Sequence, residues 1–306
     1  MTESEAKAIF EGNDFSGEVK PGSTGLVLEG GGLRGIYTAG VLDVLGEQGI
    51  SFDGVVGVSA GAVHAVSFLA RQYGRNLRFY LGYSPSAKFM GFRSWLKTGD
   101  FVNYQFCYEE IPQRLVPFDF DALEASQVPL YMVCTDVETG KPYYHRTRTI
   151  RGDQMQALRA TTSLPMMSRI VEFNDHKLLD GGTSDSIPVS FLRELGYTRT
   201  VVVVTQVAGY RKKREMPPFF KWMYRKYPAY IECMESRYKR YNETLDLIES
   251  LEKSGEIFVF RPSRKVPIRR LERDTTRILE MYELGRKDAR DRLDALKAFL
   301  KPESVE

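Results

Sequence analysis

One serine in this sequence lies in a setting that would make it a nucleophile. Ser59 stands between Gly57 and Gly61, after a short apolar run at 55–58 and before an alanine-rich helical pattern. A G-x-S-x-G motif between a strand and a helix places the serine at the tip of a sharp turn, with its hydroxyl free to attack. Glycine on both sides keeps that tight backbone uncrowded. The alternative is a turn of small residues in which Ser59 only caps the helix.

A glycine-rich loop at 30–35, with the sequence GGGLRG, precedes this serine and would suit a different chemistry. Gly30, Gly32 and Gly35 fit the G-x-G-x-x-G pattern of dinucleotide-binding folds. Those folds need an acidic residue at the end of the second strand to bind the ribose, but Asp53 lies before that strand. A dinucleotide-binding protein therefore stays an alternative that lacks its ribose ligand.

The glycine loop is better explained together with Ser59. Two parallel neighbouring strands would bring both loops to the carboxyl edge of the sheet, where open α/β folds place their sites. We expect the backbone N–H groups of Gly31, Gly32 and Ala60 to form an oxyanion hole there. Arg34 would steady the loop or bind an anionic head group.

The base that activates the serine is not a histidine in the usual order. Hydrolases of the α/β type take their histidine after the acid, whereas this chain has only His64, His145 and His176. We expect His64 to point away from the turn and the other two to be exposed polar residues. The usual triad order therefore cannot be assembled. An acid must be found elsewhere, and Asp180 is the best placed, since it ends a predicted strand and precedes two glycines that permit a close approach. The alternative for Asp180 is a plain Asp-Gly turn.

These residues need elements that bring them to one edge of a sheet. The hydrophobic patterns predict strands at 24–29, 55–58, 130–136, 143–145, 169–173, 177–180, 200–205 and 256–260. They predict helices at 36–48, 60–73, 154–160 and 274–300, and a further helix that ends near 253. The order strand, helix, strand, helix implies a parallel sheet with helices packed on it. For the aromatic residues of 75–125 we expect a helical excursion packed on the core, with the lining of an apolar ligand site as the alternative.

Composition excludes several classes of protein. The 306 residues are 42% hydrophobic and 27% charged, as in an ordinary soluble globular protein. A net charge of +3 is too small to indicate a nucleic-acid partner. Three widely spaced cysteines without a C-x-x-C pair indicate neither disulfides nor a zinc site. Because no apolar leader or membrane span is visible, we expect a cytoplasmic protein that contacts membranes at most peripherally.

Three motifs in this order resemble those of the patatin-like phospholipase family: Gly30–Gly35, Gly57–Gly61 and Asp180–Gly182. Their combination, within residues 24–205, is far more specific than any one of them. The resemblance implies a three-layer α/β/α sandwich with a mostly parallel central sheet. It also implies hydrolysis of lipid acyl esters by a Ser59–Asp180 dyad, through an acyl-serine intermediate and without metal or other cofactor. The residues that would support the site are Gly30, Arg34, Gly35, Gly57, Gly61, Gly181 and Gly182.

The resemblance divides the chain into a polar lead-in at 1–23, a catalytic domain at 24–207 and a mostly helical extension at 208–306. The extension, expected to pack on the catalytic domain, contains one strand and resembles the extra segment of bacterial members. Residues 210–240 are basic and aromatic, and form either a partly buried helical hairpin or a surface that rests on anionic lipid through Phe219, Phe220 and Trp222. A non-catalytic lipid- or protein-binding module on the same fold is the alternative function.

Overall fold

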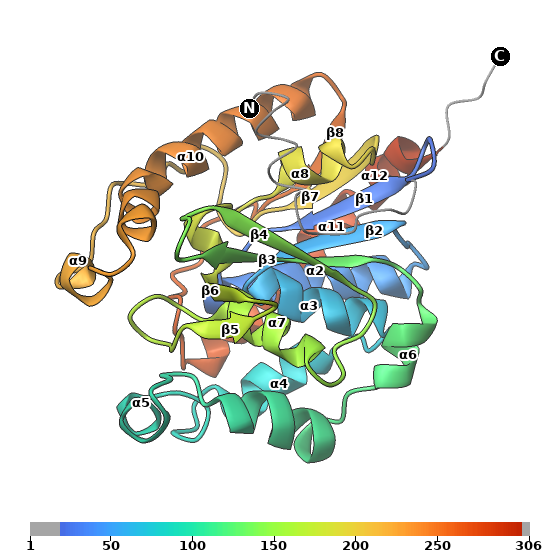
Figure 1. Cartoon of the computed structure of the whole chain (residues 1–306). Coiled ribbons are helices and arrows are strands. Elements are labelled where there is room, and N and C mark those ends of the chain that lie inside the picture. Colours follow the sequence, from blue (N-terminus) through green and yellow to red (C-terminus); the bar gives the residue numbers. More distant parts are fainter. Residues whose placement is uncertain (1–18, 302–306) are drawn as a thin grey trace.

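The computed structural model describes residues 19–301, which surround one eight-stranded sheet (Figure 1). The strands run in the order β5-β6-β3-β2-β1-β7-β8, and β4 also pairs with β3. Strands β2, β1, β7 and β8 pair in parallel, as do β2 and β3, whereas β4, β5 and β6 join by antiparallel pairs. The bounds are β1 Thr24–Leu28, β2 Gly54–Val58, β3 Leu130–Asp136, β4 Pro142–Thr147, β5 Val171–Phe173, β6 His176–Asp180, β7 Arg199–Val203 and β8 Ile257–Phe260. The prediction of a mostly parallel sheet is confirmed.

Helices cover both faces of this sheet. Alternate strand residues point to opposite sides: Leu26 and Leu28 belong to one apolar cluster and Val27 to another. The first cluster includes α2 (Ile36–Glu47), α3 (Ala60–Leu69), α7 (Gln154–Thr162), α11 (Thr275–Asp291) and α12 (Leu293–Leu300). The second includes α8 (Val189–Glu194) and α10 (Pro228–Lys253). Burial on both faces explains why the parallel strands are apolar throughout, and it confirms the three-layer α/β/α arrangement.

The segment after residue 207 extends this sheet and covers part of it. Strand β8 pairs in parallel with β7, and α11 packs along α2. That contact is close because the backbones meet at two glycines: a Cβ on Gly40 would strike the Tyr282 carbonyl oxygen, and one on Gly285 would strike that of Tyr37. The same tyrosines cross between the helices, since Tyr282 donates to Asp43 at 2.7 Å and Tyr37 donates to Asp288 at 3.2 Å.

The aromatic excursion of residues 75–125 is helical, as predicted. It comprises α4 (Arg75–Tyr83), α5 (Phe92–Thr98), the π-helix η2 (Gln105–Leu115) and α6 (Phe120–Ala125). Helix α3 ends at Leu69, earlier than predicted, and α8 was not predicted. The single helix predicted at 274–300 is wrong, because the chain leaves helical geometry at Arg292, whose guanidinium donates to the Val259 carbonyl of β8.

The basic and aromatic residues 210–240 include the short helix α9 (Phe220–Met223) and the first turns of α10. Phe219 and Trp222 are exposed, but Phe220 is fully buried against Tyr224 and Tyr230. The alternative in which Phe220 rests on lipid is therefore wrong for this residue. Within residues 19–301, no helix combines the length and apolar character needed to cross a bilayer.

Candidate active site

Ser59 occupies a strained turn between β2 and α3. Its backbone has φ 54° and ψ −123°, a conformation that residues other than glycine adopt at a cost on the order of 1–3 kcal/mol. A Cβ on Gly57 would lie 2.6 Å from the Ala62 Cα, and one on Gly61 would lie 2.5 Å from the Leu28 carbonyl oxygen. Both flanking positions therefore require glycine, and the turn projects a serine that is only 7% exposed.

A threonine of α7 holds this turn in place. The Ser59 N–H donates to the Thr161 hydroxyl at 2.9 Å, and that hydroxyl donates to the Val133 carbonyl of β3 at 2.5 Å. Sequence reasoning missed Thr161, although the run of small hydroxyl residues at 161–163 before Pro165 is a signal that could have found it. The strain at Ser59 is thus supported by a neighbouring helix and strand.

Strand β3 brings Asp180 to the serine. Val58, the residue before Ser59, pairs with Val133 of β3, and Asp180 pairs with the next residue, Cys134. Ser59 and Asp180 consequently line the same small cavity. No sequence pattern contains this register.

Hydrogen bonds fix both the backbone and one carboxylate oxygen of Asp180. Its N–H donates to the Ser163 carbonyl at 2.8 Å, and its carbonyl accepts from the Thr135 hydroxyl at 2.9 Å. Oδ1 accepts from the Gly182 N–H at 2.7 Å. A Cβ on Gly181 would strike the Val133 carbonyl oxygen, so this glycine permits the close approach to β3.

The electrostatics of Asp180 suit a base. The residue is 5% exposed, and burial raises the pKa of its carboxyl above the ordinary value. The Ser59 hydroxyl, the Gly182 N–H and the charges of Arg237 and Arg270 oppose that rise in pKa. The hydroxyl is close enough to act on the pKa, yet among the described residues Oδ2 has no partner with hydrogen-bond geometry. This buried oxygen is available to accept a proton.

The glycine loop packs directly against the serine turn. A Cβ on Gly30 would lie 3.2 Å from the Ser59 Cβ. Gly32 has φ +57°, and a Cβ there would lie 2.5 Å from the Arg270 carbonyl oxygen. Gly31 and Gly32 line the small cavity. Within the part of the chain that the structure describes, their N–H groups and that of Ala60 meet no acceptor.

Arg34 and Gly35 follow in the same loop. Arg34 is not among the described residues that line either cavity near Ser59, and its Nε is buried without a partner there. Its charge instead acts on Lys212 and Tyr241. Burial lowers the pKa of Lys212 to about 7 and the charge of Arg34 adds to this, whereas burial raises the pKa of Tyr241 and the charge of Arg34 opposes that rise. Gly35 allows the loop to reach α3, because a Cβ on it would lie 2.9 Å from the Ala60 Cβ.

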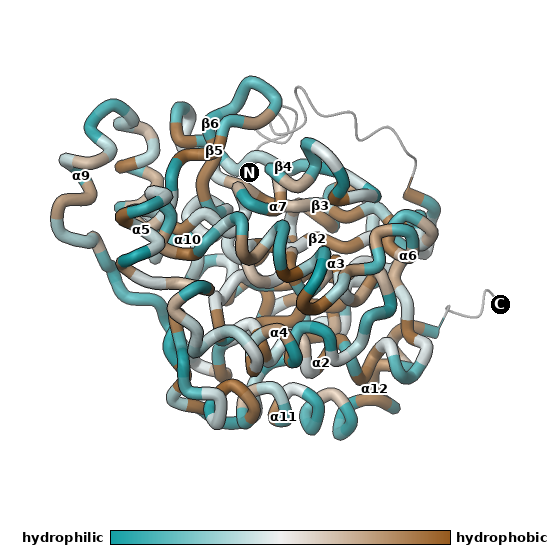
Figure 2. Tube along the Cα trace, turned by 90° about the horizontal axis from the view of Figure 1, so that it is seen from below, coloured by the Kyte–Doolittle hydropathy of each residue, from teal (hydrophilic) through white to brown (hydrophobic). Residues whose placement is uncertain are grey.

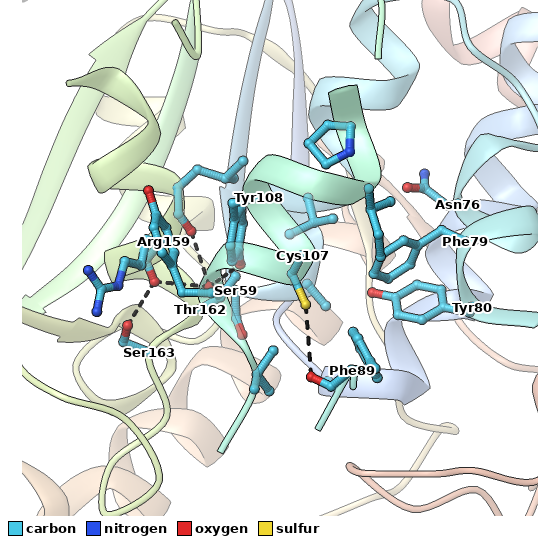
Figure 3. Close-up of a pocket in the computed structure, with 18 of the residues that line it drawn as sticks. Ser59, Asn76, Phe79, Tyr80, Phe89, Cys107, Tyr108, Arg159, Thr162 and Ser163 are labelled. Carbon is cyan, nitrogen blue, oxygen red and sulfur yellow. Dashed lines mark hydrogen bonds between the residues drawn. The ribbon is translucent and has the colours of Figure 1, made fainter. Parts of the chain in front are cut away.

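A larger, mostly apolar cavity opens on the other side of Ser59. Its volume is about 150 Å³, and it is formed by the helical excursion, α3 and α7 (Figure 3). Its apolar walls include Phe79, Tyr80, Phe89, Tyr108, Ile111 and Leu158. The excursion therefore both packs on the core and lines a space of the kind that apolar ligands occupy.

The smaller cavity is polar and holds two arginines that sequence reasoning missed. Its volume is about 30 Å³, and Arg237 and Arg270 line it together with Ser59 and Asp180. Arg237 donates from Nε to the Gly182 carbonyl at 2.5 Å. Neither arginine lies in one of the three motifs, so no local pattern marks them.

No histidine lines either cavity in the described chain. His64 is fully buried, and burial lowers its pKa to about 4. Its Nε2 lies against the glycine loop, since a Cβ on Gly35 would be 3.2 Å from it. The prediction that His145 is exposed is wrong, since it is 7% exposed and its Nε2 lies 2.6 Å from the Gln154 Oε1. His176 is half-exposed, with Nδ1 2.6 Å from the Asp136 carboxylate. Residues 19–301 contain no group of three His, Cys, Asp or Glu side chains arranged to hold a metal ion.

Known proteins resemble this chain in sequence. The family model described as patatin-like phospholipase matches residues 26–193, and a domain of unknown function (DUF6363) matches residues 227–301. The uncharacterized protein YjjU of Escherichia coli (strain K12) is 28% identical over 278 residues, covering 87% of this chain and 76% of its own.

Fungal lysophospholipases also match the region of the motifs. NTE1 of Cryptococcus neoformans is 30% identical over 185 residues, and nte1 of Aspergillus fumigatus is 30% identical over 180 residues. These alignments cover 58% and 57% of this chain but only 11% of each relative. The resemblance drawn from the motifs is confirmed, and the chain belongs to the patatin-like phospholipase family.

Proposed function

We propose that this protein hydrolyses acyl esters of lipids, with Ser59 as nucleophile and Asp180 as base. One observation carries the proposal: a strained serine and a buried carboxylate share a small polar cavity, and the same serine borders a large apolar one. The phospholipase family and the relatives named lysophospholipases support lipid esters as the substrate class.

The chemistry follows from the positions of these groups. As the Ser59 oxygen attacks the ester carbonyl, Asp180 takes its proton, and the N–H groups of Gly31, Gly32 and Ala60 stabilise the developing oxyanion. The alcohol leaves with a proton returned from Asp180, and the acyl chain stays on Ser59 in the apolar cavity. Water, deprotonated by Asp180, then attacks the acyl-serine. Asp180 returns this proton to the Ser59 oxygen as the ester bond to the serine breaks and the fatty acid leaves.

A fluorophosphonate probe and a panel of acyl esters test this function. The probe phosphonylates activated serines, so we expect one adduct, on Ser59, together with hydrolysis of phospholipid, lysophospholipid or neutral esters. Absence of both the adduct and hydrolysis would favour a non-catalytic lipid- or protein-binding module on the same fold. Thermal stabilisation by a dinucleotide would instead favour the dinucleotide-binding alternative.

Substitution of Gly31 by valine is expected to lower kcat on the order of 100-fold, the usual effect of losing one oxyanion donor. A Cβ at this position would lie 2.9 Å from the Thr205 hydroxyl, so the loop must move and its N–H turns away. The measurement is kcat on a soluble ester. Gly82→Val is the control, because Gly82 is exposed, has open space around it and has no positive φ. Unchanged turnover in Gly31→Val would place the oxyanion elsewhere.

The proposed peripheral contact with anionic membrane involves α9 and α5 rather than residues 210–240 alone. Phe219 and Trp222 at α9 are 77% and 66% exposed, and Phe92 on α5 is 65% exposed and stacks on Trp95. Both helices lie at the same end of the molecule in the two views (Figure 1 and Figure 2). Basic residues lie on these helices or just after α9: Arg93, Lys97, Lys221, Arg225 and Lys226. Exposed aromatic and basic side chains together suit an anionic lipid surface.

The loop at 164–169 relates both helices to the cavities. Phe101, just after α5, donates its N–H to the Met167 carbonyl at 2.7 Å, and the Met166 N–H donates to the Tyr224 hydroxyl, just after α9, at 2.8 Å. Leu164 of the same loop lines both cavities. A membrane held by α5 and α9 would therefore lie near the route to Ser59.

Trp222→Ser is expected to weaken binding to anionic liposomes roughly tenfold, which corresponds to about 1.5 kcal/mol for an apolar side chain withdrawn from lipid. Co-sedimentation with liposomes of increasing anionic lipid content measures it. Leu279→Ser, on α11, is the matched control, since Leu279 is also exposed. Equal binding of wild type and Trp222→Ser, or no dependence on lipid charge, would contradict the contact.

A further inference from the structure

Two arginines at the small cavity lack the carboxylate partners that other arginines of this chain have. Arg237 lies on α10, and Arg270 lies between β8 and α11, both beyond the residues matched by the patatin-like family model. Among the described residues, neither forms an ion pair within 4.0 Å of a carboxylate. Arg261 and Arg286, in contrast, contact Glu252 and Glu47 at 2.5 and 2.8 Å.

Arg237 is held through its side chain, and Arg270 through its backbone and the stem of its side chain. Arg237 uses Nε to donate to the Gly182 carbonyl, and no described residue accepts from its terminal nitrogens. The Arg270 carbonyl accepts from the Leu33 N–H at 2.9 Å, and its side-chain stem packs on Gly32. Their positive charges are close enough to act on each other and on Asp180: burial, followed by the charge of Arg270, lowers the pKa of Arg237.

This arrangement favours an anion in the cavity. Two partly buried guanidinium groups face one carboxylate, Asp180, whose free oxygen the proposed reaction requires as a base. A cation withdrawn from water without a partner is unfavourable, and an anion that accepts from both arginines would relieve this. Guanidinium groups suit phosphate oxygens, which can accept two parallel hydrogen bonds. The volume of about 30 Å³ is roughly twice that needed by one water, so a small polar group fits and an acyl chain does not.

We propose that Arg237 and Arg270 bind the phosphate group of a phospholipid substrate and thereby favour phosphate-bearing esters over neutral ones. This inference rests on the proposed function, because the ester of the same molecule must reach Ser59. Ser59 borders both cavities, so the acyl chain enters the apolar cavity while the phosphate on the alcohol side enters the polar one. Arg34, the residue that sequence reasoning offered for an anionic head group, does not line this cavity within the described chain.

Two esters that differ only in the phosphocholine group test the role of Arg270. For lysophosphatidylcholine, Arg270→Gln should lower kcat/KM roughly 10- to 100-fold, the effect of one charge-assisted hydrogen bond. The charge of Arg270 also acts on the pKa of Asp180, so both esters are compared at a pH above the inflection of wild type and variant, where Asp180 is ionised in each. There the loss of kcat/KM for the monoacylglycerol with the same acyl chain should be at least about tenfold smaller than the loss for lysophosphatidylcholine. Arg270→Lys should recover part of the loss, since lysine keeps the positive charge but cannot donate two parallel hydrogen bonds to the phosphate. Arg269→Gln is the matched control, because the neighbouring Arg269 is exposed and lines neither cavity.

Inhibition separates a lipid head group from free phosphate. With monoacylglycerol as substrate, glycerophosphocholine should inhibit wild type more strongly than inorganic phosphate does, and Arg270→Gln should lose this inhibition. Equal inhibition by inorganic phosphate would overturn the assignment to a lipid head group. An equal loss of kcat/KM for both esters, with the pH profile shifted to higher pH, would also overturn it, because Arg270 would then act only through Asp180.

Binding distinguishes failure of this inference from failure of the proposed function. Lysophosphatidylcholine, below its micelle concentration, is titrated into Ser59→Ala and into Ser59→Ala with Arg270→Gln. Binding that weakens roughly tenfold or more in the double variant supports the phosphate site, whether or not wild type hydrolyses either ester. Failure of wild type to hydrolyse both esters would refute only the proposed hydrolase activity. Equal binding by the two variants refutes the phosphate site, whatever the activity.

Discussion

Replacing Ser59 with alanine is expected to remove ester hydrolysis and fluorophosphonate labelling together while the fold stays intact. Loss of the nucleophile of a serine hydrolase lowers kcat by roughly 10⁴- to 10⁶-fold. The alanine keeps the backbone N–H that donates to Thr161, and no hydrogen bond of the Ser59 hydroxyl with good geometry holds the described fold together. Turnover of the ester panel, probe labelling and thermal unfolding measure the three consequences.

Ser51→Ala is the matched control, because Ser51 is exposed and lies just before β2, the strand that leads into Ser59. It should retain both activity and labelling. Labelling that persists in Ser59→Ala would place the nucleophile on another residue, and a lowered unfolding temperature would show that the serine also stabilises the turn.

Asp180→Asn is expected to lower kcat/KM by roughly 10²- to 10⁴-fold, the contribution of a general base. An asparagine oxygen still accepts from the Gly182 N–H, so the loop should keep its place. Stability should not fall. Burial raises the folded-state pKa of Asp180, so its contribution to stability is complete below the unfolded pKa and is lost as the pH rises through the folded one. At neutral pH the uncharged asparagine should therefore be at least as stable by thermal unfolding.

The pH profile of wild type provides the second check on Asp180. Only the ionised carboxylate can take the serine proton, so kcat/KM should rise with pH through an inflection above the ordinary aspartate value of about 4. The residual rate of Asp180→Asn should lack this inflection. Appreciable activity in Asp180→Asn with an unchanged profile would refute the dyad.

Local patterns predicted the positions of most elements. The β-branched run at 200–205 identified β7, and glycines on both sides of Ser59 identified a sharp turn. Such patterns work because backbone conformation depends on nearby residues: only glycine avoids the contacts found at Gly57 and Gly61. The one helix predicted at 274–300 is two helices, because the chain leaves helical geometry at Arg292, where no glycine or proline marks a break in the sequence.

Local sequence could not predict how buried a polar side chain is. His145 was expected to be exposed because it stands in a predicted hairpin, yet it packs against Phe173 and faces Gln154. Thr161 was not singled out, although it holds the Ser59 N–H. Burial depends on which elements pack together, and that information lies in contacts between distant parts of the chain.

The sequence by itself determined the turn at Ser59, the glycine loop and the Asp-Gly-Gly ending of a strand, because each depends on residues within a few positions. Only the tertiary structure decided that Ser59 and Asp180 meet, since their proximity comes from the pairing of β2 and β6 with consecutive residues of β3. It also decided that Arg237 and Arg270 complete the polar cavity. The physical reason is that backbone strain is local, whereas strand register and helix packing join residues distant in the chain.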